Sequence, residues 1–167
     1  MMIDNPMQRG QQWLSTLLQF VGVSAEVNAE LVTSTAASEE PDSYWLTINQ
    51  VNLQQEQVKV LIGADGSVLD AIQYLANSIL NLNQTQELQA SYTIELNGYR
   101  VRRQAEVQAL AESVASQVRS SGLEVEIKDL SSAERRQVHT FLKDFTDLET
   151  FSQGKEPHRH LVVRPAP

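Results

Sequence analysis

The chain has 167 residues, no cysteine and a formal net charge of −8, and 41% of its residues are hydrophobic. This length allows one sizeable domain or two small ones with a buried core. The absence of cysteine excludes disulfides, thiolate catalysis and cysteine-ligated metal sites. No apolar run approaches the roughly 20 residues that a membrane span needs, and the N-terminus lacks the order of a secretory signal. We therefore expect a soluble, cytoplasmic protein with no membrane partner.

The charge is distributed unevenly along the chain. Residues 1–98 hold two basic and eleven acidic side chains, a net charge of −9, whereas residues 99–167 hold eleven basic and ten acidic side chains and all three histidines. Such asymmetry usually separates units with different partners, although two solvated surfaces would also produce it. Asn97-Gly98 is a turn signal between two periodic runs. The sequence therefore predicts two domains, 1–98 and 99–167.

The first half is predicted to contain six elements in the order helix, strand, strand, helix, helix, strand. Hydrophobic periodicity and Gly or Pro punctuation define them. The helices are expected over about 10–21, 55–62 and 67–82, the strands over 23–33, 43–49 and 90–96, and an exposed loop over 34–42.

The second half is predicted to pack two helices on a three-stranded sheet. A long helix is expected over about 100–120, followed by a strand over 123–128. Ser131 and Glu134 form a capping-box pattern that begins a helix over about 131–143. Short strands over 148–152 and 160–164 complete the sheet. The fold class is therefore α+β.

Gly63-Ala64-Asp65-Gly66 lies between two predicted helices, and a strongly amphipathic helix follows it. Glycines at this spacing let the backbone turn sharply and approach another backbone closely. In some nucleic-acid-binding folds such a loop clamps the phosphates of a short single strand. The segment VLIGADGSVLDAIQYLANSIL resembles the GxxG region of a type II KH domain, and more narrowly that of the bacterial Jag family.

The loop departs from the Jag pattern, which usually has a basic residue between the two glycines. Ala64 and Asp65 occupy those positions here. A carboxylate repels a phosphate within the ~8–10 Å over which charges act at physiological salt. This favours a loop kept as a structural turn or used for a protein contact. The alternative is direct nucleic-acid binding through the backbone N–H groups of Gly63–Gly66.

The helix predicted over 131–143 carries Arg135 and His139 at i and i+4, on one face. A helical wheel places Arg136 and Lys143 on the same side, beside the apolar stripe, so we expect a cationic stripe at the surface. A guanidinium binds phosphate bidentately, and it or an imidazole can stack on an exposed base. The alternative is that Arg135 and His139 only stabilise a small domain.

The spacing of Arg135 and His139 resembles the R-three-H domain, which is named for that pair and associated with single-stranded nucleic acid. The C-terminal EPHRHLVVRP resembles the end of the same domain in Jag proteins, and the resemblance places Arg159 near the pair. Many Jag-family members carry a further N-terminal domain and linker. Since this chain starts close to the first KH helix, we expect it to lack both.

Other chemistry is weakly indicated. Tyr99-Arg100-Val101-Arg102-Arg103 is a basic start to a helix, and phosphate or acidic residues of the first half would compensate for its conflict with the helix dipole. The alternative is that these residues form only a charged, solvated face. His158 and His160 share one side of a strand, but no carboxylate–histidine signature accompanies them. No nucleophile elbow, Walker loop or paired-carboxylate pattern indicates an enzyme. We expect no catalytic residue, no metal and no cofactor.

The leading interpretation is a non-catalytic bacterial protein that binds single-stranded RNA, or single-stranded DNA, through its second half. The predicted contacts are Arg135, Arg136, His139, Lys143 and Arg159. The first half would act as a KH scaffold that pairs with another KH protein or with a second copy. The alternative is a protein-interaction module whose acidic half binds a partner and whose nucleic-acid affinity is residual.

Overall fold

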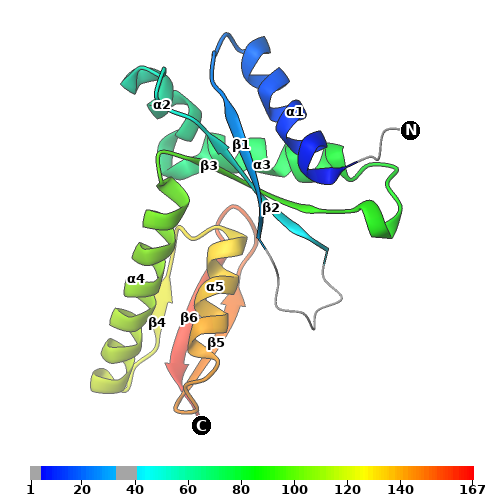
Figure 1. Cartoon of the computed structure of the whole chain (residues 1–167). Coiled ribbons are helices and arrows are strands. Elements are labelled where there is room, and N and C mark those ends of the chain that lie inside the picture. The colour runs from blue at the N-terminus through cyan, green and yellow to red at the C-terminus, as the bar shows by residue number, and fades with distance from the viewer. Residues whose placement is uncertain (1–4, 33–40) are drawn as a thin grey trace. The chain divides into compact units, whose positions relative to one another are not determined.

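The computed structural model describes residues 5–32 and 41–167, which form two compact units, Met1–Arg100 and Val101–Pro167 (Figure 1). We call them the acidic unit and the C-terminal unit. The boundary lies two residues beyond the predicted seam at Asn97-Gly98. The part of the predicted loop over 34–40 lies outside the described residues. Within the described ranges the fold is α+β, which confirms the predicted class, and no helix there is long and apolar enough to cross a membrane.

The acidic unit contains one three-stranded sheet and three α-helices among its described residues. Strand β2 is central: it pairs antiparallel with β1 and parallel with β3. The order of elements is the predicted one. Its elements are α1 (Pro6–Phe20), β1 (Val27–Val32), β2 (Ser43–Ile48), α2 (Gln55–Ile62), a 3₁₀ turn (Ala64–Gly66), α3 (Ser67–Leu80), a second 3₁₀ turn (Gln86–Leu88) and β3 (Ser91–Leu96).

Two boundaries at the start of the chain differ from the prediction for local reasons. Helix α1 begins at Pro6 because the Asn5 side chain accepts a hydrogen bond from the backbone N–H of Met7, which caps the helix. Strand β1 begins only at Val27. The N–H of Val23 donates to the carbonyl of Leu18 at 2.8 Å, so the chain stays bound to the end of α1.

The core of the acidic unit lies between one face of the sheet and the helices. Alternate residues of β2 are buried, namely Tyr44, Leu46 and Ile48. The ring of Tyr92 on β3 is also buried, and a Cβ at Gly10 would approach that ring to 2.6 Å. Gly10 therefore lets α1 lie close against the sheet.

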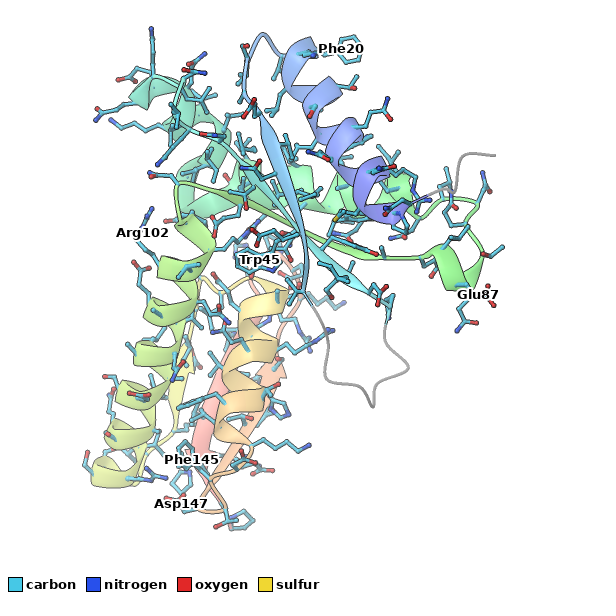
Figure 2. The ribbon with its side chains drawn as sticks, in the orientation of Figure 1. Phe20, Trp45, Glu87, Arg102, Phe145 and Asp147 are labelled. Atoms are coloured by element: carbon cyan, nitrogen blue, oxygen red, sulfur yellow. The ribbon has the colours of Figure 1, made fainter. Side chains whose placement is uncertain are left out.

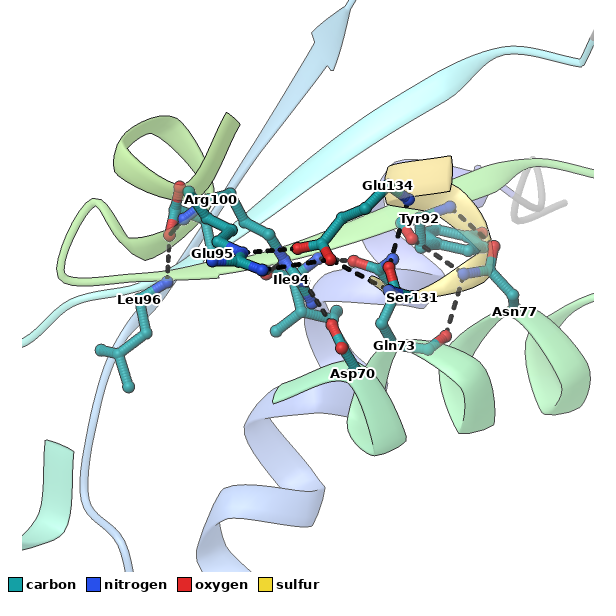
Figure 3. A network of polar contacts seen from close by, with 11 residues as sticks. Asp70, Gln73, Asn77, Tyr92, Ile94, Glu95, Leu96, Arg100, Ser131 and Glu134 are labelled. Carbon is teal, nitrogen blue, oxygen red and sulfur yellow. Dashed lines mark hydrogen bonds and ion pairs between the residues drawn. The ribbon is translucent and has the colours of Figure 1, made fainter. Parts of the chain in front are cut away.

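The outer edge of β3 is occupied by amide side chains from α3. Gln73, Asn77 and Asn81 repeat every four residues and face the strand. The Asn77 amide accepts from the N–H of Tyr92 and donates to its carbonyl, both at 2.8 Å (Figure 3). Asn81, directly after α3, does the same with Ala90. These bonds satisfy backbone groups that an edge strand would otherwise offer to another chain.

The C-terminal unit packs two helices on one face of an antiparallel sheet with strand order β4-β6-β5 (Figure 1). Helix α4 begins within the last residues of the acidic unit and continues through this one. The predicted capping box of Ser131 and Glu134 is confirmed. The elements are α4 (Tyr99–Ser121), β4 (Val125–Ile127), α5 (Ser132–Leu142), β5 (Leu148–Gln153) and β6 (His160–Pro165). The buried apolar residues between them include Val107, Ala111, Val118, Val138, Leu142, Leu161 and Val163.

Candidate nucleic-acid interface

Backbone conformation and close packing both require glycine at the two glycine positions of the GxxG loop. Gly63 and Gly66 both have positive φ, 73° and 78°. A Cβ at Gly66 would lie 2.6 Å from ring carbons of Tyr99, and one at Gly63 would lie 2.6 Å from a methyl group of Val68. Both positions therefore require glycine whether or not the loop has a ligand.

The charges at this loop are unfavourable to phosphate. Ala64 and Asp65 are exposed between the glycines, and Asp65 itself has a φ of 53°. The next charged side chain along the chain, Asp70, forms an ion pair with Arg100 (Figure 3). The guanidinium of Arg100 also donates to the carbonyl of Ile94 at 3.1 Å. Arg100 is thus engaged with the acidic unit's own groups.

The basic start of α4 is compensated by carboxylates. The buried Glu95 carboxylate accepts hydrogen bonds from the N–H groups of Leu96 and Arg100, so an anion lies where the helix dipole favours one. Within the C-terminal unit, Arg103 pairs with Glu134 at 2.7 Å. Acidic residues of the first half, Asp70 and Glu95, therefore lie beside the start of α4, as the sequence led us to expect, and Glu134 of the second half adds to them.

Arg135 does not lie on the surface, so the expected position of this residue is wrong. It is 5% exposed, because helix α5 turns it to the same side as the buried Val138 and Leu142. Its guanidinium donates to the carbonyls of Leu130 at 2.7 Å and Arg159 at 3.2 Å, and it pairs with the carboxylate of Glu156. The sequence did not show that these three groups, all outside α5, converge on one position of the helix.

The other four predicted contact residues are exposed. His139 Nδ1 contacts the hydroxyl of Thr150 on β5, and the guanidinium of Arg159 donates to the carbonyl of Gly154 at 2.8 Å. Arg136 and Lys143 make no side-chain hydrogen bond or ion pair within the described part of the chain. Their charges are therefore available to a ligand.

A groove of about 420 Å³ lies between α4 and α5, and Arg136 is one of its lining residues. Its polar lining also includes the side chains of Gln104, Gln108 and Gln137, and its apolar lining includes Phe141. Gln137 donates to the carbonyl of Gln104 at 3.1 Å, across the two helices. Sequence reasoning missed this groove, although Gln104 and Gln108 at i and i+4 share one face of α4.

On strands β5 and β6, the charged side chain of Arg164 is already paired. The guanidinium carbon of Arg164 lies 4.8 Å from the ring centre of Phe151, and Arg164 Nε bonds Glu149 at 2.8 Å. This hydrogen bond raises the pKa of Arg164 above its ordinary value. His158 and His160 belong to no group of three side chains placed to hold a metal, as far as the described residues extend.

Comparison with known proteins identifies the class of the C-terminal unit. Residues 105–165 match the R-three-H domain, and this stretch includes all five residues expected to contact nucleic acid.

The chain is also similar to proteins named RNA-binding protein KhpB. It is 30% identical over 113 residues to that of Clostridium symbiosum, covering 68% of this chain and 50% of the relative. It is 33% identical over 113 residues to that of Lactiplantibacillus plantarum, covering 68% and 34%. With that of Bacillus subtilis it is 25% identical over 161 residues, 95% of this chain and 70% of the relative. The matches thus span half or less of the first two relatives.

Proposed function

We propose that this chain is a cytoplasmic, non-catalytic protein that binds single-stranded RNA through its C-terminal unit. The R-three-H match and the relatives named RNA-binding proteins support the ligand class. The observation that carries the choice of surface is a pair of exposed cations that have no side-chain partner among the described residues, Arg136 on α5 and Lys143 at its C-terminal end. Phosphate neutralisation by such side chains supplies most of the affinity for a nucleic-acid strand.

The exposed residues divide into different tasks. Arg136, Lys143 and Arg159 would neutralise phosphates, and the His139 ring would stack on an unpaired base. The groove beside Arg136 would accommodate a base, whose edge the amides of its lining could read. Single-stranded DNA offers the same phosphates and bases, so it would be a second ligand of this surface.

Arg135 has a positioning role in this proposal. Its guanidinium holds the backbone carbonyl of Arg159 and the carboxylate of Glu156. It therefore fixes the segment between β5 and β6 that presents the Arg159 side chain. Loss of Arg135 would impair binding through the geometry of that segment, because its own charge is buried and paired.

The acidic unit would be a KH type II-like scaffold with a degenerate GxxG loop. The order α-β-β-α-α-β, with Gly63–Gly66 between α2 and α3, supports this assignment. The exposed Asp65 and the net charge of −9 over residues 1–98 oppose a phosphate contact there. Pairing with another KH protein, or with a second copy, belongs to the same proposal.

The test compares two charge-matched double variants by fluorescence anisotropy with a labelled single-stranded RNA over a range of salt concentrations. Arg136→Ala with Lys143→Ala removes the unengaged cations of α5. Lys59→Ala with Lys128→Ala removes two cations elsewhere. We expect the first variant alone to weaken binding and to reduce the slope of log K against log salt by about 1.4, or about 0.7 per lost contact. Equal slopes for both variants would show that α5 does not contact the RNA.

A further inference from the structure

An apolar groove of about 480 Å³ lies on the acidic unit between α1, α2 and α3. Each helix contributes aliphatic side chains to it, and neither glycine of the GxxG loop lines it. Its lining includes Leu17, Val21, Val60, Val68, Ile72 and Leu75. The groove is thus a surface feature separate from both predicted nucleic-acid motifs.

The side chains in and beside this groove are unusually exposed for their type. Val60 is 70% exposed, Val21 is 59% exposed, and Phe20 at the end of α1 is 84% exposed (Figure 2). Leu75 and Ile79 continue the apolar stripe along α3 with 43% and 49% of their area exposed. Soluble proteins rarely leave a contiguous apolar patch of this kind unless it binds something.

The charge of the unit selects among possible occupants. Among the described residues that line the groove, Glu56 is the charged one, and residues 1–98 carry a net charge of −9. A second copy would bring a second unit of the same charge to the interface. A nucleic acid or an anionic membrane would be repelled in the same way. A basic polypeptide is attracted by this charge.

The shape of the groove selects the conformation of that polypeptide. Its walls are three helices, whereas the edge of β3 is already occupied by Asn77 and Asn81 and cannot accept an added strand there. An amphipathic helix places apolar side chains at i, i+3, i+4 and i+7 into such a groove. The stripe from Val68 to Ile79 spans 12 residues. Its ends lie 11 steps, or roughly 16 Å at 1.5 Å per residue, apart, which matches about three turns of a partner helix.

We propose that this groove binds a basic amphipathic α-helix of a partner protein. The apolar face of that helix would cover Val60, Val21 and Leu75, and its flanking lysines or arginines would face Glu56 and the acidic surface. The proposal does not rest on RNA binding by the C-terminal unit. It assigns the acidic unit a ligand of opposite charge to the one proposed for α5.

The experiment uses the full chain and three labelled helical peptides of about 18 residues, roughly 27 Å long. The first has leucines at i, i+3, i+4 and i+7 and lysines on the flanks, the second replaces the lysines with glutamates, and the third scrambles the leucines. By fluorescence anisotropy we expect the first to bind at least about tenfold more tightly than the others, with an affinity that falls as salt rises. Equal binding of the acidic or the scrambled peptide would overturn the proposal.

Matched variants locate the site. Val60→Asp places a carboxylate in the groove, and we expect it to weaken binding of the basic peptide about tenfold or more. Val51→Asp is the control, because Val51 is 81% exposed in the same unit but does not line the groove. Val21→Asp provides a second variant in the groove, and because Val21 is 59% exposed we expect it to fold normally. Unchanged binding in both groove variants would overturn the proposal.

Two further measurements test whether the groove binds a second copy of the chain or RNA in place of a basic helix. Sedimentation velocity of the chain alone shows whether copies associate, and dimers dispersed by Val60→Asp but not by Val51→Asp would make a second copy the occupant. Loss of single-stranded RNA binding in Val60→Asp, with Val51→Asp unchanged, would make the groove a nucleic-acid site. We expect neither variant to change either readout.

Discussion

The GxxG loop of the acidic unit and helix α5 of the C-terminal unit are both motifs associated with nucleic acid, but their side chains are used differently. In the loop, both glycines are required by the contacts with Tyr99 and Val68, and the exposed charge is Asp65. On α5, the first residue of the signature pair is buried, whereas its neighbour Arg136 is exposed and has no side-chain partner in the described ranges. A motif residue can thus have a structural role while the residue next to it stays exposed, and exposure is what the proposed contact of Arg136 requires.

Burial separates these two uses more clearly than residue type does. Arg135 and Arg136 are adjacent and chemically identical, yet one donates to two backbone carbonyls and a carboxylate and the other faces solvent. We therefore expect substitution of Arg135 to lower stability and substitution of Arg136 to leave stability unchanged while weakening RNA binding.

Arg135→Ala should have the largest effect. The variant leaves the carbonyls of Leu130 and Arg159 without their donor, and we expect it to lower the free energy of unfolding by about 2–4 kcal/mol. Arg136→Ala is the control and should change it by less than about 0.5 kcal/mol, as is usual for surface sites. Urea unfolding, with hydrogen exchange to locate the loss in residues 101–167, measures both. A loss of equal size in the two variants would contradict the distinction.

Gly66→Ala should have the next largest effect. A left-handed backbone costs an L-residue about 1–2 kcal/mol, and the new Cβ would also meet the Tyr99 ring, so we expect a loss of about 2 kcal/mol or more. Gly22→Ala has nearly the same φ but no atom within 4 Å of the new Cβ. It should therefore show the backbone cost alone in thermal unfolding. If the two variants lose the same stability, close packing against Tyr99 does not contribute to the requirement for glycine at position 66.

The order of elements was predictable because it depends on local periodicity. The stripe of α3 and the alternation of β3 are visible in sequence, and the structure confirms both elements. The start of β1 was not predictable to the residue, because the hydrogen bond from Val23 to Leu18 competes with extension of the strand. Local patterns therefore predict which elements form better than where each one begins.

The site was only partly predictable because it depends on contacts distant in sequence. The helical wheel placed Arg135 beside the apolar stripe, within a small rotation of the core, and could not decide on which side of the boundary it falls. That choice is made by Glu156 and the carbonyl of Arg159, more than 20 residues away. The apolar groove was missed for the same reason, because three helices build it and the periodicity of each one alone is compatible with complete burial.

Asp65→Lys tests whether the Asp65 carboxylate prevents the GxxG loop from contacting the phosphates of RNA. If the loop lies near a bound strand, the variant should bind single-stranded RNA a few-fold more tightly and steepen the salt slope by about 0.7, equal to one added phosphate contact. Asp42→Lys makes the same change in charge at the other end of β3, where the carbonyl of Asp42 accepts from the N–H of Ser91, and should have a smaller effect. Equal gains from both variants would indicate a general effect of net charge.

The ion pair of Arg119 and Asp147 should give the smallest effect, and it tests whether exposed pairs of the C-terminal unit matter. Arg119 bonds Asp147 at 2.6 and 2.9 Å, and this hydrogen bond lowers the pKa of that carboxyl below its ordinary 3.8. Because the folded pKa is the lower one, the contribution to stability is complete above the unfolded pKa. It is lost as pH falls through the folded value.

The melting temperatures of the wild type and Asp147→Asn should therefore differ slightly at pH 6. The difference should shrink as the pH falls below 3.8 and disappear only well below the folded pKa of Asp147. Glu112→Gln provides a comparison at another exposed acidic residue of the same unit. A difference in melting temperature between wild type and Asp147→Asn that stays the same from pH 6 down to about pH 2 would show that Asp147 acts through hydrogen bonding and not through its charge. In that case the charge of Asp147 contributes nothing to the stability of the C-terminal unit.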